Sequence, residues 1–323
     1  MRVAIPIYQT QLPSGSIRYF VRLTIAGRRV DAMLDSGSVG LRLLPRALPS
    51  RAYRQSATEC AITFANGVEL RGNVARIRLM LDGATAQRST KVQIVRDVCC
   101  SSHRPNCPAE QIRKAGRIFG EGFARMGFRA VLGVGLRASG IDNPLSRFAD
   151  AWIIRLPLPG DSNPGSLILG PTSYERRGFL RFELQRHRVP TSSGEAIGWQ
   201  DVVPGSLTTK GPRRSIAGPI ALDTGAASIV VVRSGRHPQV TEDCRDARFE
   251  FADTKQKALN LSFVINDRAT PGSRTFTRPP TGRQWEGIRA GILPYHSFLV
   301  FYDRRKGVIG LKPRAGRLRA ASA

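Results

Sequence analysis

The sequence has no apolar run long enough to cross a membrane. Its apolar stretches are the length of a strand, as in Ile229–Val232, whereas a membrane-spanning helix needs about 20 apolar residues. The first residues, Met1–Thr10, turn polar before an apolar signal-peptide core could form, so we expect no signal peptide in the chain as it stands. The compartment stays open: periplasmic or secreted if the natural N-terminus lies further upstream, and cytoplasmic otherwise.

Acidic residues are few, since 24 Asp and Glu stand against 50 Lys and Arg and leave a formal net charge of +26. Only seven of the basic residues are Lys, and the other 43 are Arg. A field of this sign attracts polyanions without regard to their sequence. The arginines are nevertheless scattered, and the chain shows no aromatic-and-basic signature of a nucleic-acid module. We therefore expect at most non-specific attraction of polyanions and no specific nucleic-acid partner.

Cysteine and histidine are also scarce. The odd number of cysteines leaves at least one thiol free, or paired with another chain, if the rest are oxidised. The segment from Cys99 to Cys107 could hold zinc through its thiols and His103, but a disulfide-pinned or irregular loop is favoured because no second ligand pair is at a suitable spacing. The isolated histidines are interpreted as surface or structural, and we expect no metal and no cofactor. These residues are Cys60, Cys99, Cys100, Cys107 and Cys244, with His103, His187, His237 and His296.

Alternating apolar and polar residues dominate the chain and predict many short strands separated by turns. Helical periodicity is weak outside 106–127 and 144–151. The fold class is therefore mainly β. A chain of 323 residues is long for one core, and we predict an N-terminal unit over 1–160 and a C-terminal unit over 161–323.

One pattern occurs twice. An apolar strand ends in Asp35-Ser-Gly-Ser in the first half and in Asp223-Thr-Gly-Ala in the second. Further along each half comes a short apolar segment, Ala130–Gly133 and then 291–294, in which Pro294 takes the place of the second glycine. Two copies of one half-fold would bring Asp35 and Asp223 to a shared interface.

Two carboxylates at such an interface cannot both ionise, so they share a proton. The ionised acid then takes a proton from a water molecule that attacks a peptide carbonyl, while the protonated acid stabilises the carbonyl oxygen. Because Ser38 can donate a hydrogen bond to Asp35 and Ala226 cannot do so for Asp223, we expect Asp223 to hold the proton.

The neighbours of the two acids suit this task. Gly37 and Gly225 allow the tight turn that aims backbone amides at the carboxylates. The hydroxyl groups of Ser36 and Thr224 can bond across the interface and hold its two sides together.

At these residues the sequence resembles the pepsin-like aspartyl proteases, over most of its length. The matching segments are 131–135, 165–182 and 292–311, and the segments 35–43 and 60–72 are similar to a bacterial, divergent branch of this superfamily. The resemblance implies a bilobal fold of two related barrel-like lobes, with a polypeptide substrate in the cleft between them. It also implies a flap hairpin at 62–67, with Phe64, Asn66 and Gly67 facing the substrate and Phe64 in place of the usual Tyr. Arg42 stands where relatives carry Trp.

The expected function is therefore an aspartic endopeptidase with Asp35 and Asp223 as its catalytic pair. Two alternatives stay open. The chain can be a binding protein of the same fold with weak or no activity, as Phe64, Arg42 and Ala226 suggest. It can also be a protein that uses the fold to bind polyanions.

Overall fold

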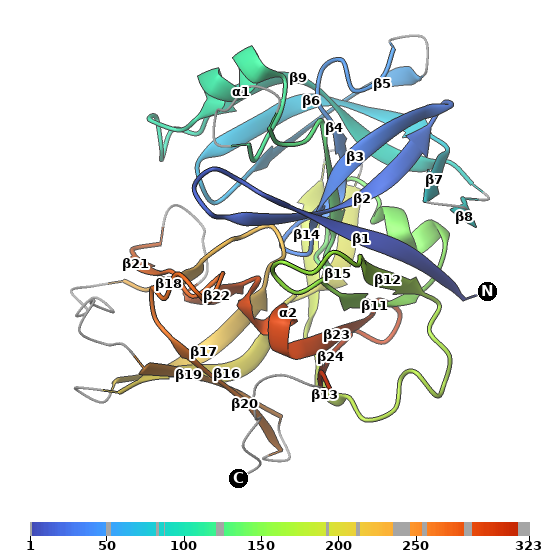
Figure 1. Cartoon of the computed structure of the whole chain (residues 1–323). Helices are drawn as coiled ribbons and strands as arrows, with labels where there is room; N and C mark the ends of the chain where they lie inside the picture. Colours follow the sequence, from blue (N-terminus) through green and yellow to red (C-terminus); the bar gives the residue numbers. More distant parts are fainter. Residues whose placement is uncertain are drawn as a thin grey trace.

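The structure is a computed structural model that describes residues 2–49, 53–81, 84–86, 88–120, 126–191, 194–210, 214–234, 246–253, 257–280 and 286–315. Strands dominate it, as the sequence predicts, and they form two large mixed sheets and a separate hairpin of β14 (Arg186–Thr191) and β15 (Gly194–Trp199) (Figure 1). The helical segments are short: α1 (Ala109–Ala115), α2 (Leu293–Ser297) and the 3-10 turn η2 (Pro144–Arg147). Within the described residues, no helix is long and apolar enough to span a membrane.

Six strands from distant parts of the chain form the base of the larger sheet. In spatial order they are β13 (Leu180–Glu183), β24 (Val308–Pro313), β23 (Phe298–Asp303), β11 (Ala151–Arg155), β12 (Gly165–Leu169) and β1 (Val3–Gln11). β12 lies between β11 and β1 and pairs with both of them. The boundary predicted at residue 160 therefore falls between two strands, β11 and β12, that are hydrogen-bonded to each other.

The same sheet continues from β1 into its N-terminal part. The further strands, in spatial order, are β2 (Ile17–Ile25), β3 (Arg28–Asp35), β10 (Ala130–Val134), β4 (Val39–Leu43), β9 (Thr90–Cys100), β6 (Val68–Ile77) and β5 (Arg54–Thr63), with β7 (Leu79–Leu81) and β8 (Ala84–Thr85) attached to β2. This part, in blue and cyan, lies above both the base strands and the second sheet in the view of Figure 1.

The second sheet has seven strands from the C-terminal half. Their order is β20 (Ala258–Val264), β19 (Asp246–Ala252), β16 (Val203–Thr209), β17 (Arg214–Leu222), β22 (Gly287–Gly291), β18 (Ile229–Val232) and β21 (Thr275–Arg278). In the described part of the chain the edge strands of each sheet do not pair with one another. The sheets are therefore open, and the closed form of the expected barrel-like lobes is not present.

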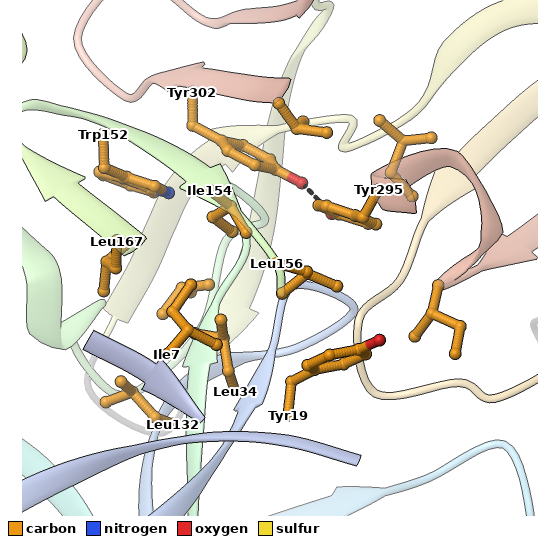
Figure 2. Packing of buried hydrophobic residues seen from close by; sticks show 14 of the residues in the cluster. Ile7, Tyr19, Leu34, Leu132, Trp152, Ile154, Leu156, Leu167, Tyr295 and Tyr302 are labelled. Atoms are coloured by element: carbon orange, nitrogen blue, oxygen red, sulfur yellow. Dashed lines mark hydrogen bonds between the residues drawn. The ribbon is translucent and has the colours of Figure 1, made fainter. Parts of the chain in front are cut away.

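A common apolar core joins the two sheets. Along β2 every second residue is buried, which puts Tyr19 and its alternate neighbours on the core face. Trp152 on β11 stacks on Tyr302 of β23 with ring centroids 5.8 Å apart, and the hydroxyl groups of Tyr302 and Tyr295 are 2.6 Å apart (Figure 2). Phe249 of the seven-stranded sheet belongs to the same cluster. The two halves are therefore held against each other by shared burial of apolar surface.

The repeated sequence pattern forms the same substructure in each half. In the first, β3 ends at Asp35, and β10 lies parallel to β3 and antiparallel to β4. In the second, β17 ends beside Asp223, and β22 lies parallel to β17 and antiparallel to β18. The predicted duplication is thus present in the strand topology.

The strand register corrects the alignment of one segment. Gly133 pairs with Asp35, whereas the glycine that pairs beside Asp223 is Gly291, opposite Leu222, and not a residue at 294. A Cβ atom at Gly291 would lie 2.8 Å from the carbonyl oxygen of Ala226, as one at Gly133 would lie 2.8 Å from the backbone of Val39. The glycine of the motif is therefore retained in both copies, and Pro294 instead sits in the first turn of α2, where Pro is tolerated.

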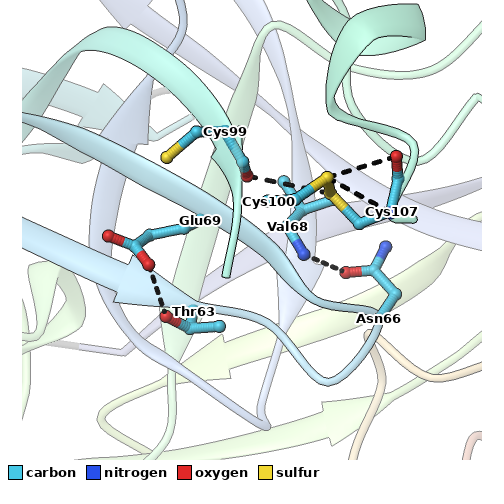
Figure 3. The surroundings of a disulfide bond; sticks show 7 residues. All are labelled: Thr63, Asn66, Val68, Glu69, Cys99, Cys100 and Cys107. Atoms are coloured by element: carbon cyan, nitrogen blue, oxygen red, sulfur yellow. Dashed lines mark hydrogen bonds between the residues drawn. A yellow bond between two sulfur atoms is a disulfide. The ribbon is translucent and has the colours of Figure 1, made fainter. Parts of the chain in front are cut away.

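Cys100 and Cys107 form a disulfide that closes the loop leading into α1 (Figure 3). Of the two readings left open for this loop, disulfide-pinned and irregular, the structure has the disulfide-pinned one. Cys60 and Cys99 are free thiols, and Cys244 lies outside the described residues. Within the part of the chain that the structure describes, no group of three His, Cys, Asp or Glu side chains could hold a metal ion.

The histidines agree with their interpretation as surface or structural residues. His103 and His187 are exposed, and His237 lies outside the described residues. His296 on α2 is buried, with its Nε2 atom 2.9 Å from the hydroxyl oxygen of Tyr19. Burial, followed by the positive charge of Arg314, lowers the pKa of His296 to about 4.

We predict that His296 makes folding sensitive to acid. The unfolded histidine binds a proton below about pH 6.5, but the folded one does not until about pH 4. Its contribution is therefore complete above pH 6.5 and is lost as pH falls toward 4, at a total of about 3 kcal/mol. Urea unfolding measures the free energy of unfolding at pH 7 and at pH 4.5. The loss between the two pH values should be smaller for His296→Gln, which can still bond to Tyr19, than for the wild type. An equal loss in both proteins would contradict this assignment.

Candidate active site

Asp35 and Asp223, the two predicted acids, come together where the two copies of the motif meet. Asp35 is 4% exposed and Asp223 is 9% exposed. A Cβ atom on Gly225 would lie 2.6 Å from Oδ1 of Asp35, and one on Gly37 would overlap the carboxyl group of Asp223. Each glycine therefore passes directly over the acid of the opposite copy. Any side chain at either glycine would push the two carboxyl groups out of place.

Reciprocal hydrogen bonds join the two loops below the acids. The backbone amide of Ser36 donates to Oγ1 of Thr224, and the amide of Thr224 donates to Oγ of Ser36, both at 2.9 Å. The Thr224 hydroxyl donates to the carbonyl oxygen of Leu34 at 2.8 Å, and the Ser36 hydroxyl donates to that of Leu222 at 3.0 Å. The hydroxyls expected to bond across the interface do so, and the pattern is close to two-fold symmetric.

The symmetry ends at Ser36, which has a third partner. Its Oγ is 2.7 Å from the hydroxyl of Tyr295, and Tyr295 in turn bonds to Tyr302 in the core. This chain of hydroxyl groups ties the base of the candidate site to the base strands of the large sheet.

Asp35 and Asp223 have different neighbours, as the sequence predicts. Asp35 accepts hydrogen bonds from the amide of Gly37 at 2.9 Å and from the hydroxyl of Ser38 at 2.5 Å. Asp223 accepts from the amide of Gly225 at 2.9 Å, and Ala226 offers no hydroxyl. Instead Nε of Arg289 lies 3.8 Å from Oδ2 of Asp223, on a side chain that is only 14% exposed.

These surroundings bear on the position of the shared proton. Burial, and then the negative charge of Asp223, raise the pKa of Asp35 to about 7, and the bond from Ser38 offsets only part of this rise. The positive charge of Arg289 lies beside Asp223 and not beside Asp35. The expectation that Asp223 holds the proton stays a prediction. It counted only the hydrogen bond from Ser38, without the burial of Asp35 or the presence of Arg289.

Arg42 is buried beside the pair, at 3% exposed. Its two terminal nitrogens donate to the carbonyl oxygens of Gly40 and Val39, at 3.0 and 2.8 Å. Burial lowers the pKa of Arg42 to about 10, while the charge of Asp35 opposes this shift. Arg42 is therefore a charged residue next to the site, fixed by its own strand.

The predicted flap is the hairpin of β5 and β6, with its turn at 64–67. Oδ1 of Asn66 accepts from the amide of Val68 at 3.2 Å, and Gly67 has a φ of +89°, a conformation that glycine adopts without strain. The Phe64 ring packs edge-on against Phe119, with centroids 5.3 Å apart. The turn thus holds its own shape, and Phe64 packs against a neighbouring ring.

The flap turn also contacts the opposite half of the molecule. Nη1 of Arg278, at the end of β21 in the seven-stranded sheet, donates to the carbonyl oxygen of Ala65 at 3.0 Å. An open pocket of about 1180 Å³ lies between the two halves near Ala227, lined by residues 13–17 of the β1–β2 turn and by 266–268 and 270–276. The lining of this pocket includes neither the two acids nor the flap turn.

Sequence reasoning missed three polar residues around the site. Arg289 and Arg278 reach it from strands of the second sheet. Asp201 is buried and accepts the amide of Leu136 at 2.8 Å, and burial raises its pKa to about 6. Arg289 could have been found, because the correct alignment makes it the counterpart of Val131, and a charge in a buried strand position is a signal. Nothing in the sequence brings Arg278 or Asp201 to the site.

Comparison of the sequence with protein-family models and with curated proteins finds no match. What the site does is therefore inferred from its own geometry and charge.

We predict that the paired acids cost stability at neutral pH. A raised carboxyl pKa means that the folded state holds a proton between about pH 4 and 7 that the unfolded state has released. Stability therefore falls as pH rises through this window. Asp35→Asn should stabilise the protein at pH 7 by on the order of 2–4 kcal/mol, with little gain at pH 4.

Thermal unfolding at both pH values measures this difference. Asp31→Asn is the matched control, since Asp31 lies on the same strand with its carboxylate exposed beside Arg22. Destabilisation of Asp35→Asn at pH 7 would show that the two acids do not repel each other in the folded protein.

Proposed function

We propose that this chain is an aspartic-type peptidase of the pepsin-like kind, with one lobe contributed by each half. The observation that carries the proposal is the meeting of two buried carboxyl groups across Gly37 and Gly225, held by the reciprocal bonds of Ser36 and Thr224. More particularly, we propose an endopeptidase that hydrolyses peptide bonds with a water molecule activated between Asp35 and Asp223. An extended polypeptide would lie in the cleft under the flap.

The asymmetry of the pair assigns the roles of the two acids. Asp223 is ionised beside Arg289 and takes a proton from the water as its oxygen attacks the carbonyl carbon. Asp35 gives its proton to the carbonyl oxygen, which forms a tetrahedral diol. In the second step Asp223 passes its proton to the departing amine nitrogen, and Asp35 recovers a proton from a diol hydroxyl. The amide bond breaks, and both acids return to their starting states.

The surrounding groups support this cycle. Ser38 and the amide of Gly37 orient the Asp35 carboxyl group, and the amide of Gly225 orients Asp223. Burial keeps bulk water from competing with the two acids for protons. Phe64 offers an apolar ring on the flap turn, but it has no hydroxyl with which to bond a partner.

A binding protein with weak or no activity is the second candidate. It is favoured by the bond from Arg278 to Ala65, because this bond joins the flap turn to the opposite half across the cleft. A cleft fastened in this way would hold a peptide without turnover. The sequence-based expectation of non-specific polyanion attraction stays a prediction.

Replacement of either acid should abolish cleavage. A denatured protein mixture is incubated at pH values from 3 to 8 with the wild type, Asp35→Asn and Asp223→Asn, and the products are separated by mass. We expect each variant to lose at least about 10³-fold in rate, because the two acids act as one unit. Asp31→Asn is the control and should keep full activity. A folded wild type that cleaves nothing, or a fully active Asp35→Asn, would refute the peptidase function.

Arg289 should set the pH at which the peptidase works. Its positive charge favours the ionised form of the coupled pair, so removing it makes both protons harder to lose. Arg289→Met, which keeps the length of the side chain, should move both limbs of the pH–rate profile upward by about 0.5–1 unit. Arg248→Met, in an exposed position on β19, is the control. If the pH–rate profiles of the wild type and Arg289→Met coincide, the charge of Arg289 does not affect the protonation of the two acids.

A further inference from the structure

Three arginines converge between the flap turn and Asp223. Arg278 lies at the end of β21 and donates to the flap carbonyl of Ala65. The positive charges of Arg104 and Arg289 both act on it. Arg104 borders the same turn, since a Cβ atom on Gly67 would contact its side chain, and Arg289 borders Asp223. The cluster therefore extends from the flap to the catalytic pair.

Arg278 is the least satisfied member of this cluster. Its Nε and Nη2 atoms are buried, and neither has a hydrogen-bond partner among the described residues. Burial, followed by the charges of Arg104 and Arg289, lowers its pKa to about 10, so it stays positively charged at neutral pH. A cation with two buried and unused donors is costly unless an anion satisfies them.

The two unused donors also suit one shape of anion. Nε and Nη2 form one edge of the planar guanidinium group, and their N–H bonds point in parallel. This is the arrangement that grips the two oxygens of a carboxylate. Nη1, on another edge, remains bonded to Ala65 while this happens.

We propose that Arg278, supported by Arg104 and Arg289, forms a subsite for a carboxylate of the peptide substrate. The inference rests on the proposed peptidase function and adds a substrate class to it. The carboxylate comes either from an Asp or Glu side chain beside the scissile bond or from the C-terminus of the peptide. Its binding offsets one positive charge of the cluster and places the substrate between the flap and Asp223.

Matched peptides test this subsite. The cleavage sites in a denatured protein mixture are first identified by mass spectrometry, and a peptide around a preferred site is synthesised. One pair differs only by Glu or Gln at the candidate position, and a second pair only by a free or an amidated C-terminus. The ratio of kcat/KM within each pair is measured at pH 6, where Glu is ionised.

We expect the wild type to favour the carboxylate in one of the two pairs by about tenfold or more. The favoured pair identifies the source of the carboxylate. In Arg278→Gln the ratio should fall to near one, even if loosening of the flap also slows both peptides, because a flap defect affects the two equally. Arg188→Gln, an exposed charge on β14, should keep the wild-type ratio. Arg104→Gln gives a smaller fall and serves as a second variant if Arg278→Gln does not fold.

A wild-type ratio near one in both pairs, with normal cleavage, would overturn the subsite and leave the peptidase function standing. If the wild type cleaves nothing, calorimetric binding of matched Glu and Gln peptides, and of matched free and amidated C-termini, on any extended peptide separates the two proposals. If the wild type binds the carboxylate peptide more tightly than its neutral partner, and Arg278→Gln abolishes this preference, the subsite is supported in a non-catalytic protein. Equal binding of all peptides would overturn it.

Discussion

The reciprocal hydrogen bonds between Ser36 and Thr224 fix the two loops that carry the acids. Two carboxyl groups that repel each other would separate if their loops were free to move. The loops cannot move, because each backbone amide is satisfied by the hydroxyl of the other copy, and Ser36 is further tied to Tyr295 and the core. Two glycines complete the arrangement, since only a residue without Cβ can pass over the opposite acid at this distance.

The two halves differ most in where each places an arginine. In the first half Arg42 on β4 lies opposite Val131 on β10, and in the second half Val230 on β18 lies opposite Arg289 on β22. Equivalent cross-strand pairs in the two copies therefore each contain one arginine and one valine. The arginine is on the first strand of the pair in one copy, β4, and on the second strand in the other, β22. Arg42 is held by carbonyl oxygens of its own strand, whereas Arg289 approaches Asp223. One duplicated scaffold thus gives its two acids different electrostatic surroundings.

This difference gives a physical reason for the division of roles proposed for the two acids. A symmetric pair would share its proton evenly, whereas here Asp35 and Asp223 differ in their hydrogen bonds and in the nearby charge of Arg289. The excess of arginine in the chain has a local consequence as well. Most arginines are scattered over the surface, yet Arg278 contacts the flap turn and Arg289 lies beside Asp223, where low solvent exposure makes their charge felt.

The strands, the duplicated motif and the contrast between Ser38 and Ala226 were readable from the sequence, because they depend on local alternation and on residues a few positions apart. The sequence also indicated that the hydroxyl groups of Ser36 and Thr224 can bond across the interface, and it left the loop from Cys99 to Cys107 as disulfide-pinned or irregular. Only the tertiary structure decided that Gly291 completes the second motif, since strand register and a bulge at Leu222, not residue type, set that pairing. It alone brought Arg278 to the flap turn and Asp201 to the site. Burial and charge at a site depend on chain segments far apart in sequence, and folding alone brings them together.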